Sequence, residues 1–383
     1  MLNIEIIKNC TSCAACLNIC PKDAISFKSN KEGFSYPHVS VDLCIGCNLC
    51  NLACPLQYIG NTKELPIHSI ALKNKDAYLR ESSSSGGVFF SLAKKTIENG
   101  GVVYGAKFND EWKVLHSSAT DMDSLHGLMQ SKYSQSSIGK IFRDIKSHLI
   151  NYRNVLFVGT PCQVSGLNGF LRHKEYNNLV TVELCCHGVP SPGVWKKYIH
   201  EEFDVSKIKS INFRSKKNGW RNYSLEIENI DGSIYCKPKM EDPYMRGFLY
   251  GLSMRPSCYN CPNKPFNSSA DIVIGDYWGV DLKHQDFNDG KGVSLALALT
   301  DKGKKYLSKI DTDFDVIDIT WDDATSVNGN FLKSTPVNKR RRSFFWFLQS
   351  LGFSVKNSVN IALMPYPHSI IKNKIVRICK KLH

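Results

Sequence analysis

Two runs of cysteines in the first 55 residues have a spacing that suits iron–sulfur chemistry. In each run, three cysteines are separated from one another by two residues, a fourth follows after three more, and a proline comes next. The cysteines of the two runs are Cys10, Cys13, Cys16, Cys20 and Cys44, Cys47, Cys50, Cys54. Three thiolates at this spacing can face inward on one tight loop and bind three irons of a cubane, so the fourth thiolate must come from another loop.

We therefore predict two 4Fe–4S clusters in a module of the bacterial-ferredoxin type, in which the fourth ligand crosses over. One cluster would be held by Cys10, Cys13, Cys16 and Cys54, and the other by Cys44, Cys47, Cys50 and Cys20. Short strands over 24–27 and 34–38 would join the two ligand loops. The alternative is zinc, which needs four ligands, usually as two well-separated pairs. Eight cysteines in a twofold repeat favour the clusters.

Four more cysteines follow strands or form a pair in the body of the chain. They are Cys162, Cys186, Cys258 and Cys261. The first two directly follow predicted strands over 154–158 and 179–184, and the last two form a Cys-x-x-Cys pair before a predicted strand over 271–276. One interpretation is a third 4Fe–4S cluster on all four cysteines.

Other interpretations of these cysteines stay open. Cys162 and Cys186 are small residues of a kind that is often simply buried. Cys258 and Cys261 could form a redox dithiol, because the Cys-x-x-Cys spacing lowers a thiol pKa. A thiol at a junction between strand and loop could also be a nucleophile with His187 as its base, although no third group that would orient His187 is evident.

The body from residue 81 onward has the pattern of an α/β domain. A Ser/Gly loop over 82–87 precedes an apolar-periodic helix over 88–97, and a strand follows over 102–106. Loops at the carboxyl ends of strands are where α/β folds bind ligands. Hydroxyls and N–H groups at a helix N-terminus can hold a phosphate. The loop predicts a phosphate-bearing cofactor on Ser84, Ser85, Gly86 and Gly87, with a plain helix cap as the alternative.

Several of these motifs together resemble the family of beta subunits of coenzyme F420 hydrogenases and dehydrogenases. The motifs are Ser-Ser-Ser-Gly-Gly-Val at 83–88, Ser-Lys-Tyr-x-Gln-Ser at 131–136, Gly-Thr-Pro-Cys-Gln at 159–163, Cys-His-Gly-Val-Pro-Ser at 186–191 and Asp-Ile-x-Ile-Gly-Asp-Tyr-Trp-Gly at 271–279. They occur in the family's order. The resemblance extends from the cysteine runs to roughly residue 300.

Members of that family are iron–sulfur flavoproteins that pass electrons between clusters, FAD and a small substrate. The resemblance implies a third cluster on the four body cysteines and a mixed α/β fold specific to the family. It also implies flavin contacts from Ser84, Ser85, Gly86, Gly87, Lys132 and Gln163. Lys132 would neutralise a phosphate or the flavin ring, whereas without a cofactor it would be a solvated surface lysine. The substrate does not carry over from the resemblance.

The 383 residues suggest two or three domains. We predict a ferredoxin domain over 1–60, a linker over 61–80, the flavin and iron–sulfur α/β domain over 81–300, and a C-terminal extension over 301–383. The N-terminus lacks the basic leader and apolar run of a signal peptide, and no stretch is apolar for long enough to span a membrane. We therefore expect a cytoplasmic protein, in which 15 cysteines favour metal or redox chemistry over disulfides.

The net charge of +14 comes mostly from the end of the chain. Residues 339–383 contain ten basic residues and no acidic ones, whereas the remainder has 39 basic and 35 acidic residues. This pattern is weak evidence for nucleic-acid binding, and no nucleic-acid partner is expected. Apolar residues recur at helical spacing in two stretches of the tail, at Phe344, Leu348, Leu351, Val355 and at Ile371, Ile375, Ile378, Leu382. Two basic amphipathic helices could lie on an anionic membrane surface or pack on the body.

We expect a cytoplasmic iron–sulfur flavoprotein oxidoreductase. Electrons would enter singly from a ferredoxin or another redox partner, and FAD would pair them for a small organic substrate. No catalytic proton donor is identified, and His187 is a candidate only because it lies beside a proposed ligand. Two alternatives are an electron-wiring subunit with no substrate site and a non-catalytic scaffold or redox sensor.

Overall fold

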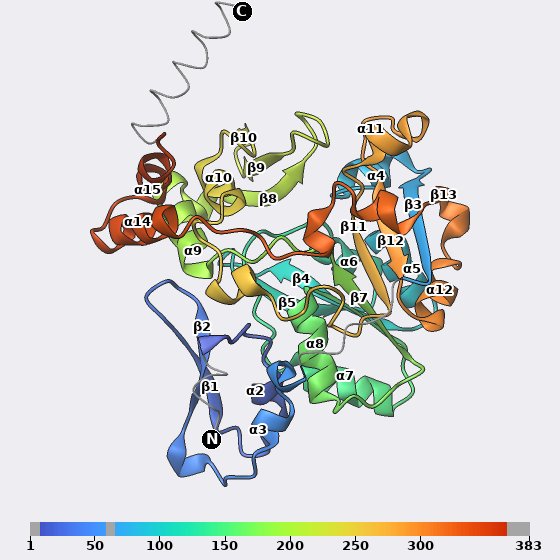
Figure 1. Cartoon of the computed structure of the whole chain (residues 1–383), viewed down its shortest axis with the longest axis horizontal. Helices are drawn as coiled ribbons and strands as arrows, with labels where there is room; N and C mark the ends of the chain where they lie inside the picture. Colours follow the sequence, from blue (N-terminus) through green and yellow to red (C-terminus); the bar gives the residue numbers. More distant parts are fainter. Residues whose placement is uncertain (1–7, 59–65, 366–383) are drawn as a thin grey trace, which may run out of the picture.

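The computed structural model describes residues 8–58 and 66–365 as a small cysteine-rich module joined to a large α/β domain (Figure 1). The module consists of α2 (Ala15–Ile19), β1 (Ile25–Ser29), β2 (Ser35–Val39) and α3 (Leu49–Leu52). Its two strands pair antiparallel between the two cysteine loops. Within the described residues, no helix has the length and apolar character that crossing a bilayer requires.

An eight-stranded mixed sheet forms the centre of the large domain, in the order β13-β3-β12-β11-β7-β6-β4-β5. Its strands are β3 (His68–Asn74), β4 (Val102–Phe108), β5 (Val114–Ala119), β6 (Val155–Gly159), β7 (Leu179–Leu184), β11 (Ile272–Asp276), β12 (Ser294–Ala298) and β13 (Phe314–Asp318). Strands β4, β6, β7 and β11 are parallel to their neighbours in this series. Their carboxyl ends therefore meet at one edge of the sheet, and that edge carries the site described below.

Helices cover the faces of this sheet and connect its strands. They are α4 (Ala77–Ser82), α5 (Val88–Glu98), α6 (Met122–Leu128), α7 (Ile141–Ile150), α8 (Pro161–Phe170), α11 (Val280–Lys283), α12 (Asp301–Leu307) and α13 (Trp321–Thr325). Residues of α5, α6 and α12 share one buried cluster with the sheet, and α7 and α8 share another. These clusters bury apolar residues from both faces of the sheet, which stabilises it through the hydrophobic effect.

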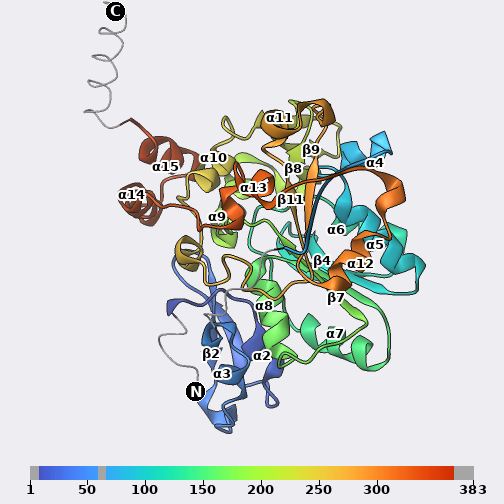
Figure 2. The same cartoon turned by 45° about the vertical axis from the view of Figure 1, so that its right-hand side comes forward.

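A second, three-stranded sheet lies beside the main sheet. Its strands are β8 (Ile208–Ser215), β9 (Ser224–Asn229) and β10 (Ile234–Pro238). It packs with four further helices around an aromatic core, and these are α9 (Pro192–Glu202), α10 (Pro243–Leu249), α14 (Lys339–Ser350) and α15 (Val355–Ala362). Figure 2 shows α14 and α15 beside α10, above the cysteine-rich module.

The cysteine-rich module is not an independent domain, because it shares a buried core with α7 and α8. Ala14, Ala15 and Ala53 lie in the same apolar cluster as Phe157 and Leu167. The fit is close, since a Cβ added at Gly166 of α8 would lie 2.6 Å from the Cβ of Cys13. Helix α8 therefore brings the large domain into direct contact with the first cysteine loop.

Two predicted domain boundaries were wrong. In the predicted linker over 61–80, residues 68–74 form β3, which lies between β12 and β13 in the main sheet, and residues 61–65 lie outside the described part. The apolar run of that strand is only Ile70-Ala71-Leu72, too short to show a period. The extension predicted from 301 begins instead with α12 and β13, whose Leu307 and Phe314 lie in the main core.

The first predicted tail helix is two helices that pack on the body. The chain turns between α14 and α15, where Gly352 has a φ of +84°. The turn divides the predicted stripe, so Leu348 and Val355 are buried, whereas Phe344 and Leu351 are 43% and 58% exposed. The second predicted stripe, from Ile371 to Leu382, lies outside the described residues.

Candidate functional site

The eight cysteines of the module form two groups. Cys20, Cys44, Cys47 and Cys50 line one cavity, and we call them the second outer set. The first outer set is Cys10, Cys13, Cys16 and Cys54, whose thiols are electrostatic neighbours. Burial is the main cause that raises the pKa of Cys13 well above its usual value, and the neighbouring thiols raise it further. Such thiols become thiolates only beside a strong positive charge, which a bound metal group supplies.

The four cysteines of the body surround another cavity. Cys162, Cys186, Cys258 and Cys261, here called the inner set, line it together with residues of both domains. Cys162 lies in the first turn of α8, Cys186 follows β7, and the pair Cys258 and Cys261 comes from the loop before β11. Burial is the main cause that raises the pKa of Cys162 to about 11 and that of Cys258 to about 12.

Each of the three sets consists of four thiols, which is the number of ligands that either a zinc ion or a 4Fe–4S cluster takes. In the described part of the chain, no group of three or more His, Cys, Asp or Glu side chains is close enough to hold one metal ion. Zinc binds its thiolates at about 2.3 Å and so draws them together. A cubane holds its four thiolates further apart, because each binds a different iron. Each of the three sets has the four thiols that a 4Fe–4S cluster requires.

The inner set touches both the module and a larger cavity. Thr11, the neighbour of Cys10, lines the inner cavity, and its hydroxyl hydrogen bonds the thiol of Cys162. On the other side, four consecutive residues at 186–189 line both the inner cavity and the larger one, which we call the main cavity. The inner set is therefore the link between the first outer set and the main cavity.

The main cavity has a volume of about 430 Å³ and lies at the carboxyl ends of β6, β7 and β11. That volume is within the range of ligand pockets, roughly 300–1,000 Å³. Asn328 Oδ1 and His116 Nδ1 are buried in its wall without a hydrogen-bond partner in the described residues. Buried polar atoms of this kind need a partner, so the wall fits a ligand that carries polar groups.

The Ser/Gly loop forms one wall of the main cavity. Ser84, Ser85 and Gly87 line it, but Gly86 lies behind them, where its N–H donates to Ser294 Oγ at 2.8 Å. The two serine hydroxyls already have partners within the protein, because Ser84 Oγ accepts from Ser131 and Ser85 Oγ donates to Val293 O. Gly87, at φ +96°, is the N-cap of α5; the first N–H groups of a helix have no partner within it, and Val88 and Phe89 of the first turn line the cavity.

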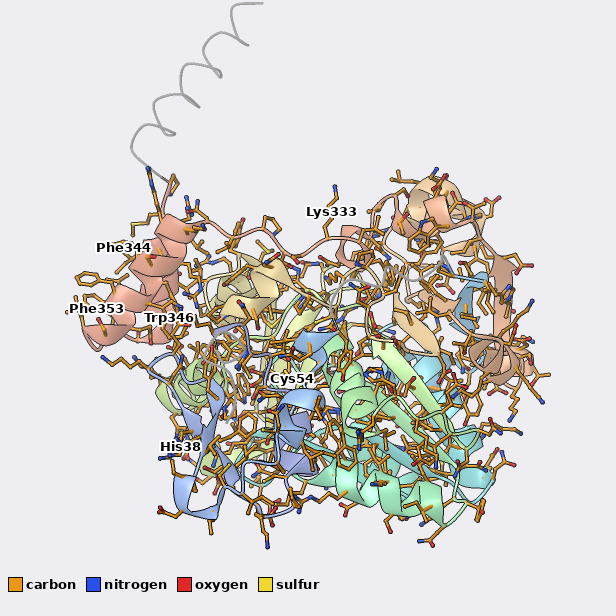
Figure 3. All side chains as sticks on the ribbon, turned by 60° about the horizontal axis from the view of Figure 1, so that its bottom comes forward. His38, Cys54, Lys333, Phe344, Trp346 and Phe353 are labelled. Carbon is orange, nitrogen blue, oxygen red and sulfur yellow. The ribbon has the colours of Figure 1, made fainter. Side chains whose placement is uncertain are left out.

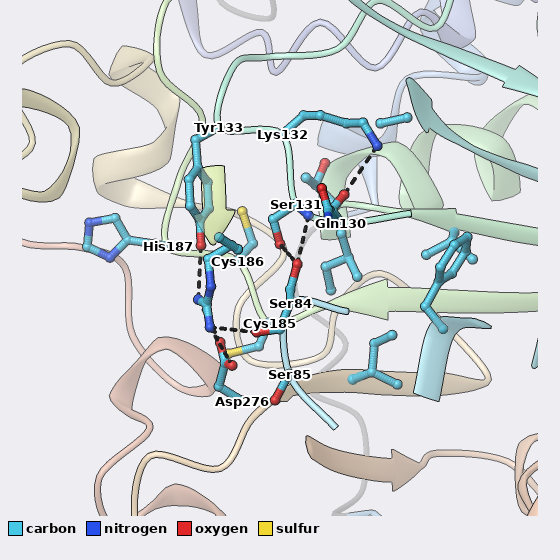
Figure 4. A pocket seen from close by; sticks show the side chains of 18 of the residues that line it. Ser84, Ser85, Gln130, Ser131, Lys132, Tyr133, Cys185, Cys186, His187 and Asp276 are labelled. Atoms are coloured by element: carbon cyan, nitrogen blue, oxygen red, sulfur yellow. Dashed lines mark hydrogen bonds and ion pairs between the residues drawn. The ribbon is translucent and has the colours of Figure 1, made fainter. Parts of the chain in front are cut away.

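Lys132 and Gln163 both line the main cavity. The Lys132 amino group donates to Gln130 O at 3.3 Å and to Met129 O, and Figure 4 shows its side chain running away from Tyr133 and Asp276. Burial lowers the pKa of Lys132 to about 7. Gln163 is nearly saturated, since its Oε1 accepts from Thr160 N at 2.9 Å and its Nε2 donates to Ser136 Oγ at 2.8 Å. Gln163 therefore forms part of the wall, whereas Lys132 can change between a neutral amine and a protonated, positively charged one near neutral pH.

The Lys132 shift predicts a pH dependence of stability in the flavin-free chain. Between pH 7 and 10.5 the unfolded chain holds a proton at this lysine that the folded chain has released, so the free energy of unfolding rises with pH. The rise is up to about 1.4 kcal/mol per pH unit. In urea unfolding between pH 7 and 9, we expect Lys132→Met to remove most of the increase in the free energy of unfolding with pH that Lys132 causes. Lys94→Met, on the exposed side of α5, should leave the slope unchanged, and an equal loss in both variants would contradict the assignment.

A buried ion pair lines the main cavity next to the Ser/Gly loop. The Arg214 guanidinium donates to both carboxylate oxygens of Asp276 at 3.0 and 2.8 Å, to Tyr133 Oη at 3.2 Å and to Ser84 O at 3.0 Å (Figure 4). Trp220 Nε1 also donates to Asp276 at 2.9 Å. The pair therefore joins β8, β11, the Ser/Gly loop and the loop before α7.

His187 lies between the inner cavity and the main cavity and lines both. Its Nδ1 is 3.3 Å from Thr335 Oγ1, and burial lowers its pKa. No carboxylate pairs with it among the described residues, so it lacks the carboxylate that orients the histidine base of a catalytic triad. Asp276 and Tyr133 lie within the motifs at 271–279 and 131–136, whereas Arg214 lies outside all the motifs, so no sequence pattern predicted its place at the site.

Two family models match the chain. Residues 152–320 match the C-terminal domain of the coenzyme F420 hydrogenase/dehydrogenase beta subunit, and residues 9–58 match a 4Fe–4S dicluster domain. The first region contains the inner set, and the second contains both outer sets. The comparison therefore supports an iron–sulfur electron-transfer protein related to these oxidoreductases.

Individual proteins show the same relationship. The chain is 22% identical over 334 residues to a subunit of the F420H2 dehydrogenase of Methanosarcina mazei, covering 82% of this chain and 86% of that protein. A ferredoxin of Methanocaldococcus jannaschii is 46% identical over 50 residues, 13% of this chain and 26% of that one. A chain of the F420-reducing [NiFe] hydrogenase complex of Methanosarcina barkeri has a similar fold, with a TM-score of 0.50, 17% identity and coverage of 74% and 94%. With its cysteine-rich module and its α/β domain each matched in this way, the chain is a protein similar to the beta subunits of coenzyme F420 hydrogenases and dehydrogenases and carries an N-terminal 4Fe–4S dicluster domain.

Proposed function

We propose that this chain is an iron–sulfur flavoprotein oxidoreductase that carries electrons between a redox partner protein and FAD in the main cavity, beside which a small organic substrate reacts. The three cysteine sets would each hold a 4Fe–4S cluster. A cluster exchanges one electron and a flavin can exchange two, so the pair connects a one-electron partner with a two-electron substrate. One observation carries the proposal, namely that the inner set shares its lining with both the module and the main cavity.

The residues of the main cavity support a flavin in specific ways. The N-terminus of α5, beyond Gly87, favours a phosphate group because of its unpaired N–H groups and its dipole. Lys132 would become protonated beside that phosphate or beside an anionic ring, which restores its lowered pKa toward the ordinary value. Arg214 holds Ser84 and Tyr133 in place from behind. The proposal gives these residues the role of binding and orienting the flavin.

Chemical analysis after anaerobic purification tests the proposal. About twelve irons, four for each cysteine set, with matching sulfide and one FAD are expected per chain. Eight irons and no flavin would contradict it. Reduced ferredoxin offered with candidate acceptors then distinguishes a reductase from a wiring subunit, because only a reductase turns over the acceptor by itself.

The wiring subunit is the second candidate, because the matched relatives are named as parts of larger assemblies. One is a subunit of F420H2 dehydrogenase, and another belongs to a hydrogenase complex. In that role the chain would hand its electrons to another subunit, and the main cavity would bind flavin without a separate substrate. Turnover that appears only after a partner subunit is added would favour this candidate over the first.

A peripheral membrane contact through α14 also stays a proposal. Phe344, Phe347 and Leu351 are 43%, 54% and 58% exposed, and Lys339 and Arg340 lie exposed on the same helix. Figure 3 shows Phe344 and Phe353 pointing away from the body. Exposed aromatic and basic side chains together suit an anionic lipid surface.

Flotation with anionic lipid vesicles tests this contact. The full chain is expected to float at low salt, and a variant with Phe344, Phe347 and Leu351 all replaced by serine is expected to lose most of that binding. Serine at Ile230 and Ile234, which are exposed on the β9–β10 hairpin, is the matched control and should float normally. Equal flotation of all three proteins, insensitive to salt, would contradict the contact.

A further inference from the structure

Arg255 is a fully buried arginine that forms no ion pair with an acidic side chain in the described residues. Its side chain has no exposed surface, and no carboxylate forms an ion pair with it in the part of the chain that the structure describes. Neutral groups hold the guanidinium instead, since it donates to Cys10 O at 2.7 Å, to Gln135 Oε1 at 3.1 Å and to Ser35 O at 3.1 Å. The guanidinium also lies over the Tyr36 ring, 4.3 Å from its centroid. A buried charge is costly unless something compensates it, so an uncompensated arginine here requires an explanation.

The place of Arg255 supplies that explanation. Its Nε binds the carbonyl of Cys10, a member of the first outer set, and its side chain lines the cavity of the inner set. Gln135, which accepts from Arg255, donates in turn to Thr11 O at 2.9 Å. Arg255 therefore lies between the first outer set and the inner set, within the same hydrogen-bonded unit.

Lys264 is a second cation on the inner cavity. Its amino group donates to Cys186 O at 2.6 Å and to Lys333 O at 3.1 Å, and no described carboxylate pairs with it. The cavity of the second outer set differs, because the lysine in its lining, Lys22, is exposed and screened by water. The inner cavity thus carries two partly or fully buried positive charges that have no acidic partner among the described residues.

We propose that Arg255 and Lys264 make the inner set the preferred electron-holding position of the chain, so that electrons move inward from the outer sets toward the main cavity. Reduction adds one negative charge to a cluster without forming or breaking a bond, and the electron comes from a reduced outer cluster, which is oxidised by the same amount. A buried positive charge stabilises the more negative form far more than an exposed one does. Net charge and hydrogen bonds around the sulfurs are among the factors that set cluster potentials. This inference rests on the cluster that the proposed function places on the inner set.

Redox titration of the anaerobically purified full chain, followed by electron paramagnetic resonance, tests the inference. Iron is counted first in every variant, and the signal that disappears in Cys162→Ser identifies the inner cluster. In the parent chain, we expect the inner cluster to have the highest midpoint potential of the three. Arg255→Met should lower that potential by at least about 59 mV, which corresponds to a tenfold change in electron distribution for a one-electron couple. The second outer set should not shift.

Matched variants separate the charge from the hydrogen bonds. Arg255→Lys keeps the charge and should retain most of the potential, and Lys264→Gln should lower it in the same direction as Arg255→Met. Arg342→Gln is the control, since Arg342 also contacts this region through Met254 O but already pairs with Glu32. It should leave the potential of the inner cluster unchanged.

The possible outcomes test this inference separately from the proposed function on which it rests. An Arg255→Met chain that keeps all its iron and shows an unmoved inner potential would overturn the inference, as would an inner cluster of lowest potential in the parent chain. If Arg255→Met fails to fold, Lys264→Gln decides alone, and an unmoved potential there overturns the inference too. Eight irons in the parent chain would instead refute the proposed cluster itself.

Discussion

Replacing Cys186 by alanine is expected to remove one four-iron group from the chain, whereas replacing its neighbour Cys185 should leave the iron content unchanged. Cys186 lines the inner cavity, but Cys185 faces the main cavity and lies outside the inner set. A cubane held by three thiolates is weakly retained, so iron should fall from about twelve to about eight per chain. Iron and sulfide analysis after anaerobic purification measures the difference.

The same pair of variants reports on electron flow. Cys186→Ala should also slow flavin reduction by an outer-set donor by orders of magnitude, because the inner set is the contact between the module and the main cavity. Cys185→Ala should keep that rate, provided that its flavin content matches the parent. Retention of all iron by Cys186→Ala, or an equal loss in both variants, would contradict the inner set. Cys236→Ser, on β10 and away from all three cavities, completes the controls.

Asp276→Asn is expected to destabilise the chain by about 3–5 kcal/mol, because it leaves Arg214 buried without its counter-charge. The Arg214 side chain is 3% exposed, and Asp276 holds the guanidinium in a charged state by raising its pKa against the effect of burial. Urea unfolding under anaerobic conditions measures the loss. Flavin content should fall as well, since Arg214 holds the Ser84 carbonyl of the cavity wall.

Two comparisons make this second prediction specific. The exposed pair of Lys113 and Glu111 is the control, and Glu111→Gln should leave the free energy of unfolding nearly unchanged, because water screens both charges. The double replacement of Arg214 by Met and Asp276 by Leu should recover much of the stability, because apolar residues of similar volume often replace a buried pair at little cost. Flavin content should remain low in the double variant. If Asp276→Asn is as stable as Glu111→Gln, the prediction is contradicted. The neutral hydrogen-bond partners that remain would then be enough to stabilise the buried charge of Arg214.

The predicted apolar stripe over 344–355 did not match the buried residues of α14, because tertiary packing determines which face of that helix is buried. Phe344 and Leu348 share a predicted stripe, yet only Leu348 is buried, and the neighbouring Phe345 is buried in its place. The single-sequence period could not show the turn at Gly352, which starts a new helix with a new phase. The strand His68–Asn74 was missed for a similar reason, since it obtains its stability from β12 and β13, which follow it by more than 200 residues.

Local spacing determined the chemistry of this protein, because a cubane needs cysteines at fixed separations and prolines close the loops, so the two runs at residues 10–20 and 44–54 could be interpreted directly. The strands over 154–158, 179–184 and 271–276 were likewise visible, because buried parallel strands are continuous apolar runs. Only the tertiary structure brought Cys162, Cys186 and the Cys258–Cys261 pair around one cavity, since the first turn of α8 and two separate loops meet there. Only the tertiary structure placed Arg255 between that cavity and Cys10. The two residues are 245 positions apart in the chain, so no local sequence pattern could predict that they meet.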